Sequence, residues 1–344
     1  MGKPNAPRPT LSDVAQYAGV SLATASKAVN GRADVAAATR IRIEAAIEAT
    51  GYELGRHRIA VPNPAIEFLV DKLTSPYAME ILRGVTLAAE EAGIDIVVGR
   101  FRPAGVKTGE EVIRRLGRSG RVGAIIITAE MSGATHRAIS KSTLPIVLID
   151  PLRVDGSSVV SVGSTNWIGG RSATEHLIGL GHRRIAFIGG PAESLSARAR
   201  ADGFRSAAES AGLTVPQDFI THTQFDHDAA ESAASVLLRR EDRPTAIIAS
   251  SDAQAMGVLE AARQLDMRVP EHLSLVGYDD TYVASWANPP LTSVYQPLQD
   301  IGRVALRTVQ QLHAGEQLDS HHIELATRLV VRESTAPPSD RNRP

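Results

Sequence analysis

The sequence predicts a small all-α head followed by an α/β core of two lobes, each built on a parallel, doubly wound sheet. The first observation is that residues 10–50 hold short helical patterns and no β-rich run. The second is that β-rich runs alternate with amphipathic helices from residue 65 onward, as crossover connections between parallel strands require. The third is that this alternation occurs as two successive series, which indicates two similar lobes.

The head begins with two helices joined by a tight turn. Apolar residues recur at helical spacing over 11–18, and Gly19 and Ser21 then provide a turn and an N-cap for a second helix over 22–30. The exposed face of this second helix carries Leu22, Ala23, Thr24, Ser26 and Lys27. Such a pair predicts a helix-turn-helix, whose second helix enters the major groove of DNA. The alternative is an ordinary helical hairpin without a DNA partner.

A third helix and a linker complete the N-terminal part. The helical period over 37–50 stops at Gly51, a typical C-terminal signal. The residues that follow lack a period and contain two prolines, which predicts a linker. We therefore assign residues 1–55 to a helix-turn-helix head, 56–64 to a hinge, 65–335 to a ligand-binding core and 336–344 to a disordered tail.

The core consists of two series of strands and helices. The expected strands are 65–70, 95–99, 122–128, 145–150, 184–190, 218–223, 245–250, 273–279, 292–297 and 324–334. The expected helices include 77–92, 167–180, 197–211, 229–239, 253–265 and 298–313. The first lobe is assigned to 65–162 and 293–321, and the second to 163–292 and 322–335. Parallel sheets bind ligands at the carboxyl ends of their strands, so two facing lobes predict a ligand cleft.

Composition excludes several kinds of site. The 344 residues include no cysteine, which excludes disulfides, cysteine-based zinc sites and thiol catalysis. The sequence contains no Walker loop, G-x-S-x-G, H-E-x-x-H or dinucleotide glycine motif, and the pair His321-His322 lacks metal-ligand spacing. We therefore expect no enzyme, no cofactor and no metal. The start of the chain shows no secretory signal pattern, and no apolar run reaches the roughly 18–20 residues of a membrane span, so we expect a cytoplasmic protein without a membrane partner.

Charge is distributed unevenly along the chain. The net charge is −1, but residues 1–60 carry eight basic and five acidic side chains. A basic head on a mildly acidic body suits a DNA reader with a separate sensing domain.

Several sequence blocks resemble one family along nearly the whole chain. They are TLSDVAQYAGVSLATASKAVNG (10–31), HLIGLGHRRIAFIGGP (176–191), ARADGF (199–204), RVPEHLSLVGYDD (268–280) and PPLTSVYQP (289–297). Their order and spacing resemble the lactose-repressor (LacI/GalR) family of bacterial transcription regulators. Three further blocks, at 73–84, 162–170 and 196–204, look like those of repressors of sugar utilisation, of the xylose or xylan type. The resemblance implies a core similar to periplasmic sugar-binding proteins.

The resemblance also implies roles for residues of the head. Leu22 and Ala23 match the family's principal specificity positions, and Lys27 stands where the family commonly has arginine. Lysine reaches guanine only as a flexible point charge, so we expect a softer readout than a bidentate arginine provides. We expect phosphate contacts and helix caps from the hydroxyl and amide side chains of Thr10, Ser21, Thr24, Ser26 and Asn30. The alternatives are a pure N-cap at Ser21 and a solvated side chain at Lys27.

The hinge departs from the family pattern. Family members carry a hinge helix with a leucine that wedges into the minor groove, whereas this chain has ELGRHRIAVPNP at 53–64. Val61 falls at the wedge position, with Ile59 as a second candidate, so we expect a shallower wedge. Arg56 and Arg58 are expected along phosphates.

The resemblance places further residues in the cleft. Arg200 and Asp279 match effector-binding positions of the family, and Ser251 stands where the family usually has asparagine. The remaining candidate ligand contacts are Tyr77, Asp150, Trp167, Ser196, Arg198 and Phe225, with Trp286 as a further stacking platform. Asp252 is expected to cap the following helix. The alternatives are a salt bridge for Arg200 and Asp279, and plain packing for each aromatic ring.

These features together predict a homodimeric transcriptional repressor of carbohydrate-utilisation genes. Two heads would bind a near-palindromic operator in double-stranded DNA, and a small sugar effector would release them. The alternatives are an activator, a regulator that needs a co-repressor, or a sugar-binding transport component.

Overall fold

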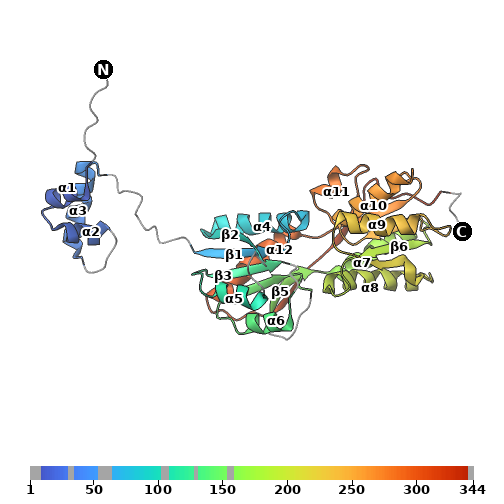
Figure 1. Cartoon of the computed structure of the whole chain (residues 1–344), viewed down its shortest axis with the longest axis horizontal. Coiled ribbons are helices and arrows are strands. Elements are labelled where there is room, and N and C mark those ends of the chain that lie inside the picture. The colour runs from blue at the N-terminus through green and yellow to red at the C-terminus, as the bar shows by residue number, and fades with distance from the viewer. Residues whose placement is uncertain are drawn as a thin grey trace, which may run out of the picture. The chain divides into compact units, whose positions relative to one another are not determined.

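The structure is a computed structural model that describes residues 9–29, 35–52, 64–101, 108–127, 131–152 and 159–339. The chain divides into two compact units between residues 63 and 64 (Figure 1).

The N-terminal unit is a three-helix head. Its helices are α1 (Leu11–Ala18), α2 (Leu22–Val29) and α3 (Ala37–Thr50). Thr10 begins α1 with a capping box, in which its hydroxyl accepts from the Asp13 backbone and the Asp13 carboxylate accepts from the Thr10 backbone. The small apolar core is formed by Val14, Ala18, Ala28, Val35, Ile43 and Ala46. Gly51 ends α3 in the left-handed conformation, as expected from the sequence.

The first lobe of the core contains a six-stranded sheet in the order β11-β5-β4-β3-β1-β2. All of its neighbouring strands are parallel. Its strands are β1 (Ala65–Val70), β2 (Asp95–Arg100), β3 (Gly123–Ile127), β4 (Ile146–Ile149), β5 (Val160–Ser164) and β11 (His322–Leu325). One face is covered by α4 (Pro76–Ala92) and α12 (Leu298–His313), and the other by α5 (Gly109–Leu116) and α6 (Gly133–Ser140).

The second lobe repeats this architecture in the order β12-β10-β9-β8-β6-β7. Only β12 runs antiparallel to its neighbour among these described strands. The strands are β6 (Ile185–Gly189), β7 (Ile220–His222), β8 (Ala246–Ala249), β9 (Ser274–Asp279), β10 (Thr292–Tyr295) and β12 (Arg328–Val330). The helices are α7 (Asn166–Gly179), α8 (Leu195–Ser210), α9 (His227–Leu238), α10 (Asp252–Gln264) and the short α11 (Tyr282–Trp286).

Three crossings connect the two lobes, and all three lie a few residues later in the chain than the sequence assignment placed them, the first because β5 of the first sheet runs to Ser164. Strand β10 belongs to the second sheet although 293–321 was assigned to the first lobe. Strand β11 belongs to the first sheet although 322–335 was assigned to the second lobe. The chain therefore crosses near residues 165, 296 and 326. The run 324–334 was expected to be one strand, but Ala326 and Thr327 interrupt it between two sheets without a glycine or proline to mark the break.

The end of the described chain is held by the second lobe. Ala336 donates its backbone N–H to the Ser274 hydroxyl, and its carbonyl accepts from Ser274. The expected disorder from residue 336 is therefore wrong for Ala336, and residues 340–344 lie outside the described part. No helix within the described residues is long and apolar enough to cross a membrane.

Candidate functional site

Helix α2 presents the predicted reading face of the head. Leu22, Ala23 and Lys27 are exposed, with Leu22 retaining 52% of its accessible surface, while Ala25 and Ala28 are buried against the other helices. An exposed leucine at the start of this helix leaves an apolar side chain accessible, as the predicted contact with thymine methyls requires.

Hydroxyl groups of the head are partly engaged within it. Ser21 accepts from the backbone N–H of Thr24 at 3.1 Å, so it is the N-cap of α2 that the sequence predicted. The Thr10 hydroxyl donates to Asp13 at 2.8 Å within its own capping box. Both residues stay candidates for phosphate contact through their helix N-termini. Asn30, Arg56 and Val61, together with Arg58 and Ile59, lie outside the described residues.

Two arginines of α3 that the sequence reading missed contact the C-terminal ends of α1 and α2. The Arg42 guanidinium donates to the carbonyl oxygens of Ala18 and Gly19, and Arg40 donates to the carbonyl oxygen of Ala28. Cations near helix C-termini satisfy carbonyl groups that have no partner within the helix. The positions of Arg40 and Arg42 within α3 do not indicate that they bind these carbonyl oxygens, because the carbonyl groups belong to segments that are distant in the sequence.

A cavity of about 510 Å³ lies between the two lobes of the core. Seven of the nine predicted ligand residues line it: Tyr77, Asp150, Ser196, Arg200, Phe225, Ser251 and Asp279. Trp167 and Arg198 do not line it and are exposed on α7 and α8. Arg171 lies 5.6 Å from the centre of the Trp167 ring, and Trp286 packs against Tyr282 elsewhere on the second lobe, with the two rings tilted by 53°. Arg198 lies two residues before Arg200, so a helix directs the two side chains to different faces.

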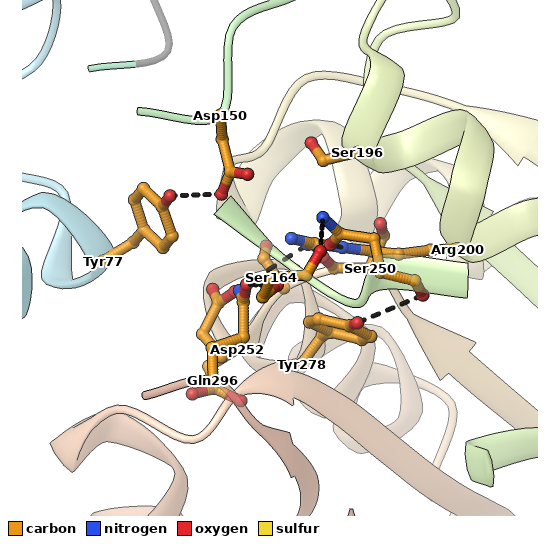
Figure 2. A network of polar contacts seen from close by, with 12 residues as sticks. Tyr77, Asp150, Ser164, Ser196, Arg200, Ser250, Asp252, Tyr278 and Gln296 are labelled. Atoms are coloured by element: carbon orange, nitrogen blue, oxygen red, sulfur yellow. Dashed lines mark hydrogen bonds and ion pairs between the residues drawn. The ribbon is translucent and has the colours of Figure 1, made fainter. Parts of the chain in front are cut away.

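Arg200 forms the centre of the cleft and is 3% exposed. Its Nε donates to the Asn166 side chain at 2.7 Å and its Nη1 donates to the backbone oxygen of Ser250. The guanidinium lies 3.9 Å from the centre of the Tyr278 ring (Figure 2). Two of its three nitrogens therefore already donate to protein oxygens. The guanidinium therefore has only part of its donor capacity left for a ligand.

Close contact between α7 and α8 positions Arg200. A Cβ atom added at Gly170 would lie 2.1 Å from the Arg200 backbone oxygen, and one added at Gly203 would lie 2.1 Å from the Trp167 backbone oxygen. These two glycines let the helix backbones approach closely. Arg200 is thereby held over Tyr278, whose burial raises the pKa of the phenol above its ordinary value.

The crossings contribute a chain of buried polar groups that supports Asp279 from outside the cavity lining. Gln296 donates to Asp279 at 2.7 Å and accepts from the Ser164 hydroxyl. Asp279 also lies 3.8 Å from Arg200, and its φ of 105° lies outside the range that most residues adopt. Burial raises the pKa of Asp279 well above its ordinary value, while the nearby Arg200 lowers it. Sequence reasoning missed Gln296, because its partners come from distant segments.

Tyr77 and Asp150 form the wall of the cleft on the first lobe. The Tyr77 hydroxyl donates to the Asp150 carboxylate (Figure 2). Burial raises the pKa of Asp150, and Arg200 and the Tyr77 hydroxyl act in the opposite direction. Removal from solvent and the charge of Asp150 raise the pKa of the Tyr77 phenol. The pair therefore presents a carboxylate acceptor beside an aromatic ring.

Ser251 and Gln254 support the wall of the cleft on the second lobe. Ser251 is the N-cap of α10 and contacts the Gln254 side chain at 3.3 Å. The Gln254 amide donates to the Gly189 carbonyl, the Thr223 hydroxyl and the Gln224 carbonyl. These bonds hold the loop that ends in Phe225, whose ring lies 5.9 Å from the Arg200 guanidinium. Gln254 was missed, because a glutamine within a helix resembles any surface polar residue.

Asp252 does not cap α10, contrary to expectation. Ser251 is the cap, whereas the Asp252 carboxylate accepts from the backbone and hydroxyl of Thr281 and from the Ser293 hydroxyl. Asp252 is 1% exposed, and its burial raises its pKa to about 7.

Comparison with known proteins agrees with both units. Residues 10–53 match the family described as bacterial regulatory proteins, lacI family, and residues 174–335 match the periplasmic binding protein-like domain. The ribose operon repressor of Escherichia coli (strain K12) is 31% identical over 336 residues, which cover 94% of this chain and 99% of that protein.

Solved structures agree as well. A complex of the transcriptional regulator CelR with cellobiose has a TM-score of 0.71 and 32% identity, covering 95% of this chain and 100% of that one. The lac repressor dimer bound to operator and the anti-inducer ONPF has a TM-score of 0.75 and 27% identity, covering 96% and 100%. The chain belongs to the lacI family of bacterial regulatory proteins.

Proposed function

We propose that this protein is a homodimeric transcriptional repressor of carbohydrate-utilisation genes that a small sugar releases from its operator. One observation supports this above the others: a buried polar cleft between two lobes belongs to a chain whose first helices form a helix-turn-helix. The ribose, CelR–cellobiose and lac repressor relatives support a saccharide effector and a dimer on operator DNA. Such a regulator acts in the cytoplasm, without an enzymatic step of its own.

We assign the DNA contacts to the exposed face of α2. Leu22 and Ala23 would contact base edges, Lys27 would reach a guanine, and Thr10, Ser21, Thr24 and Ser26 would lie near phosphates. A dimer requires two half-sites about one helical turn apart, so the operator should be nearly palindromic.

We assign the effector contacts to the cleft. Asp150, Asp279 and Arg200 would bind hydroxyl groups, while Tyr77 and Phe225 would cover the C–H surface of a sugar ring. Ser196 lines the same cavity and is a further contact. Xylose or a short xylo-oligosaccharide is the first ligand to test, because of the blocks that resemble xylan-type repressors.

A thermal-shift screen over sugars, followed by operator titration with each sugar that binds, tests the proposal. A sugar that raises the melting temperature and weakens operator binding supports a sugar-released repressor. A sugar that stabilises the protein but leaves operator affinity unchanged favours the transport-type alternative. A sugar that strengthens operator binding favours a regulator that needs a co-repressor.

Lys27→Ala tests the reading helix in the same titration. Loss of a contact to a base should cost about 1–3 kcal/mol and relax the preference at one base pair of each half-site. Glu48→Ala, an exposed change on α3, should leave that preference intact. An unaltered preference in Lys27→Ala would place Lys27 in solvent or on a phosphate.

A further inference from the structure

The cleft contains more acidic than basic groups. Among the described residues that line it, five carry carboxyl groups, namely Asp71, Asp150, Glu193, Asp252 and Asp279, and two are basic, namely Lys72 and Arg200. Three of the acids are buried, and the buried base that faces them is Arg200. The interior of the cleft is therefore an unfavourable place for a further negative charge.

Both basic side chains of the cleft already face carboxylates. Arg200 lies 3.8 Å from Asp279, and its charge also acts on Asp150. Lys72, at the exposed rim, lies 3.3 Å from Asp226. A phosphate or carboxylate on a ligand would have to compete with these acids for either base. Strong anion sites differ from this one, because they offer arginine or lysine groups in excess.

Helix N-termini at the cleft do not supply an anion site either. Helices α4, α8 and α10 begin there, and an N-terminus favours negative charge through its exposed N–H groups. Each of these ends is capped by its own serine, namely Ser75, Ser194 and Ser251. Helix α10 also carries Asp252 in its first turn, so its dipole already stabilises a carboxylate of the protein.

We infer that the cleft selects an uncharged saccharide and discriminates against phosphorylated and acidic sugars. This inference rests on the proposed function, because it takes the effector to be a sugar. Sugar hydroxyls donate hydrogen bonds to Asp150 and Asp279, whereas a phosphate or uronate group offers only acceptors to them when ionised. The rings of Tyr77 and Phe225 cover the apolar face of the sugar.

A cationic amino sugar fits less well than a neutral one. The three buried carboxyl groups outnumber the one buried base, and Asp252 is the one without a basic partner among the described residues. Its two oxygens already accept three hydrogen bonds from Thr281 and Ser293. Asp150 and Asp279 share the charge of Arg200. An ammonium group at Asp150 or Asp279 would therefore lie close to the Arg200 guanidinium and be repelled by it, whereas a neutral hydroxyl would not.

Calorimetry on the full chain with matched sugars tests the inference. The neutral probes are xylose, xylobiose, ribose, glucose, galactose and cellobiose, and the charged counterparts are ribose 5-phosphate, glucose 6-phosphate, glucuronate, galacturonate, cellobionate and glucosamine. A neutral sugar should bind, and its anionic counterpart at least about tenfold more weakly. The inference is wrong if an anionic counterpart or glucosamine binds as tightly as its neutral parent, or if no neutral probe binds.

These outcomes are distinguishable from failure of the proposed function. An anionic sugar that binds and weakens operator binding overturns the charge inference and leaves a sugar-controlled repressor intact. A neutral sugar that binds selectively without changing operator affinity supports the charge inference and counts against the proposed repressor mechanism.

Variants connect the selectivity to the buried acids. Asp150→Asn should shift the ratio of glucose 6-phosphate to glucose affinity toward the phosphate by about tenfold, because it removes one nearby charge. Glu193→Gln at the exposed rim, the matched control, should change the ratio less than about threefold, because water and salt screen its charge. Asp279→Asn provides the same test if Asp150→Asn does not fold. A ratio unchanged by the folded buried-site variant would overturn the assignment of selectivity to these carboxylates.

Discussion

Arg200 connects elements of the cleft that lie far apart in the sequence. It donates to Asn166 at the start of α7 and to the backbone directly after β8, lies over Tyr278 and faces Asp279. A guanidinium suits this place, because its planar fork donates in several directions and stacks on an aromatic ring at once. The same side chain therefore both holds the cleft together and lines its cavity.

Arg200→Lys should weaken binding of the neutral sugar by about tenfold or more and lower the stability of the core by about 1–3 kcal/mol. The lysine keeps the charge but loses the fork, so buried oxygens lose their donors. Calorimetry and thermal unfolding measure the two effects. Arg198→Lys, on the exposed face of the same helix, is the matched control and should leave both quantities unchanged. Equal losses in the two variants would contradict the role of Arg200.

Asp252 should make the stability of the core depend on pH. Its pKa is about 7 in the folded protein against 3.8 as the ordinary value, so the folded state binds its proton more tightly. The free energy of unfolding should therefore decrease as pH rises from about 4 to about 7, and Asp252 should add no further change above that range. Asp252→Asn should make the decrease between pH 5 and pH 7.5 smaller, as measured by denaturant unfolding. Asp228→Asn, at a side chain that is 97% exposed, should keep the wild-type slope. Parallel curves for wild type and Asp252→Asn would rule out this ionisation.

At the scale of elements, α10 carries the second-lobe wall of the cleft. Its cap Ser251 replaces the asparagine that the family resemblance led us to expect, and the serine hydroxyl is used within the helix. A longer polar side chain at this position would extend farther toward a ligand. Helix α10 instead provides Gln254, whose amide donates hydrogen bonds to the loop that ends in Phe225. Gln254 is thus a positioning residue.

Gln254→Leu should lower stability by about 1–3 kcal/mol, because the buried amide no longer connects the end of β6 to the loop that ends in Phe225. The affinity for the neutral sugar should also fall, since Phe225 is no longer held in place. Stability comes from denaturant unfolding and affinity from calorimetry. Gln264→Leu, at an exposed position on the same helix, should change the stability by less than about 0.5 kcal/mol. Sugar affinity that survives in folded Gln254→Leu would show that the loop holds Phe225 without this residue.

Most strands and long helices could be predicted, because their apolar periods are local properties of the sequence. Strand β5 was not singled out, since its residues VSVGS hold few large apolar side chains. The break between β11 and β12 was also missed, because the change of sheet is imposed by hydrogen-bond partners in β5 and β10. The short helices α5, α6 and α11 were also not predicted, because a helical period that spans only one or two turns is difficult to recognise in a sequence.

At the scale of the whole molecule, three crossings of the chain connect the two lobes, and the cleft lies beside these crossings. Gln296 and Ser164 lie at two of these crossings, and Gln296 accepts from Ser164 and donates to Asp279. A ligand that changes the contacts of Asp279 therefore acts at the connection between the lobes. This arrangement gives the cleft a physical route to alter the geometry of the first lobe.

Operator and sugar should weaken each other's binding by the same factor, because the coupling free energy between two sites is reciprocal. We expect about 1–3 kcal/mol, measured as sugar affinity with and without saturating operator, and operator affinity with and without saturating sugar. A truncated chain that begins at residue 64 should bind the sugar with an affinity that operator DNA does not affect. Unequal factors, or sugar affinity independent of operator in the full chain, would refute allosteric release.

The sequence by itself determined the helix-turn-helix, the two series of strands and helices, and seven of the residues that line the cleft. Periodicity, turn residues and motif spacing are local, so one chain suffices to read them. Only the tertiary structure decided that Trp167 and Arg198 face away, that Ser251 serves as a cap, and that Asn166, Gln254 and Gln296 hold the cleft together. The reason is physical: the role of a buried polar side chain depends on which distant donors and acceptors the fold brings within hydrogen-bonding distance of it.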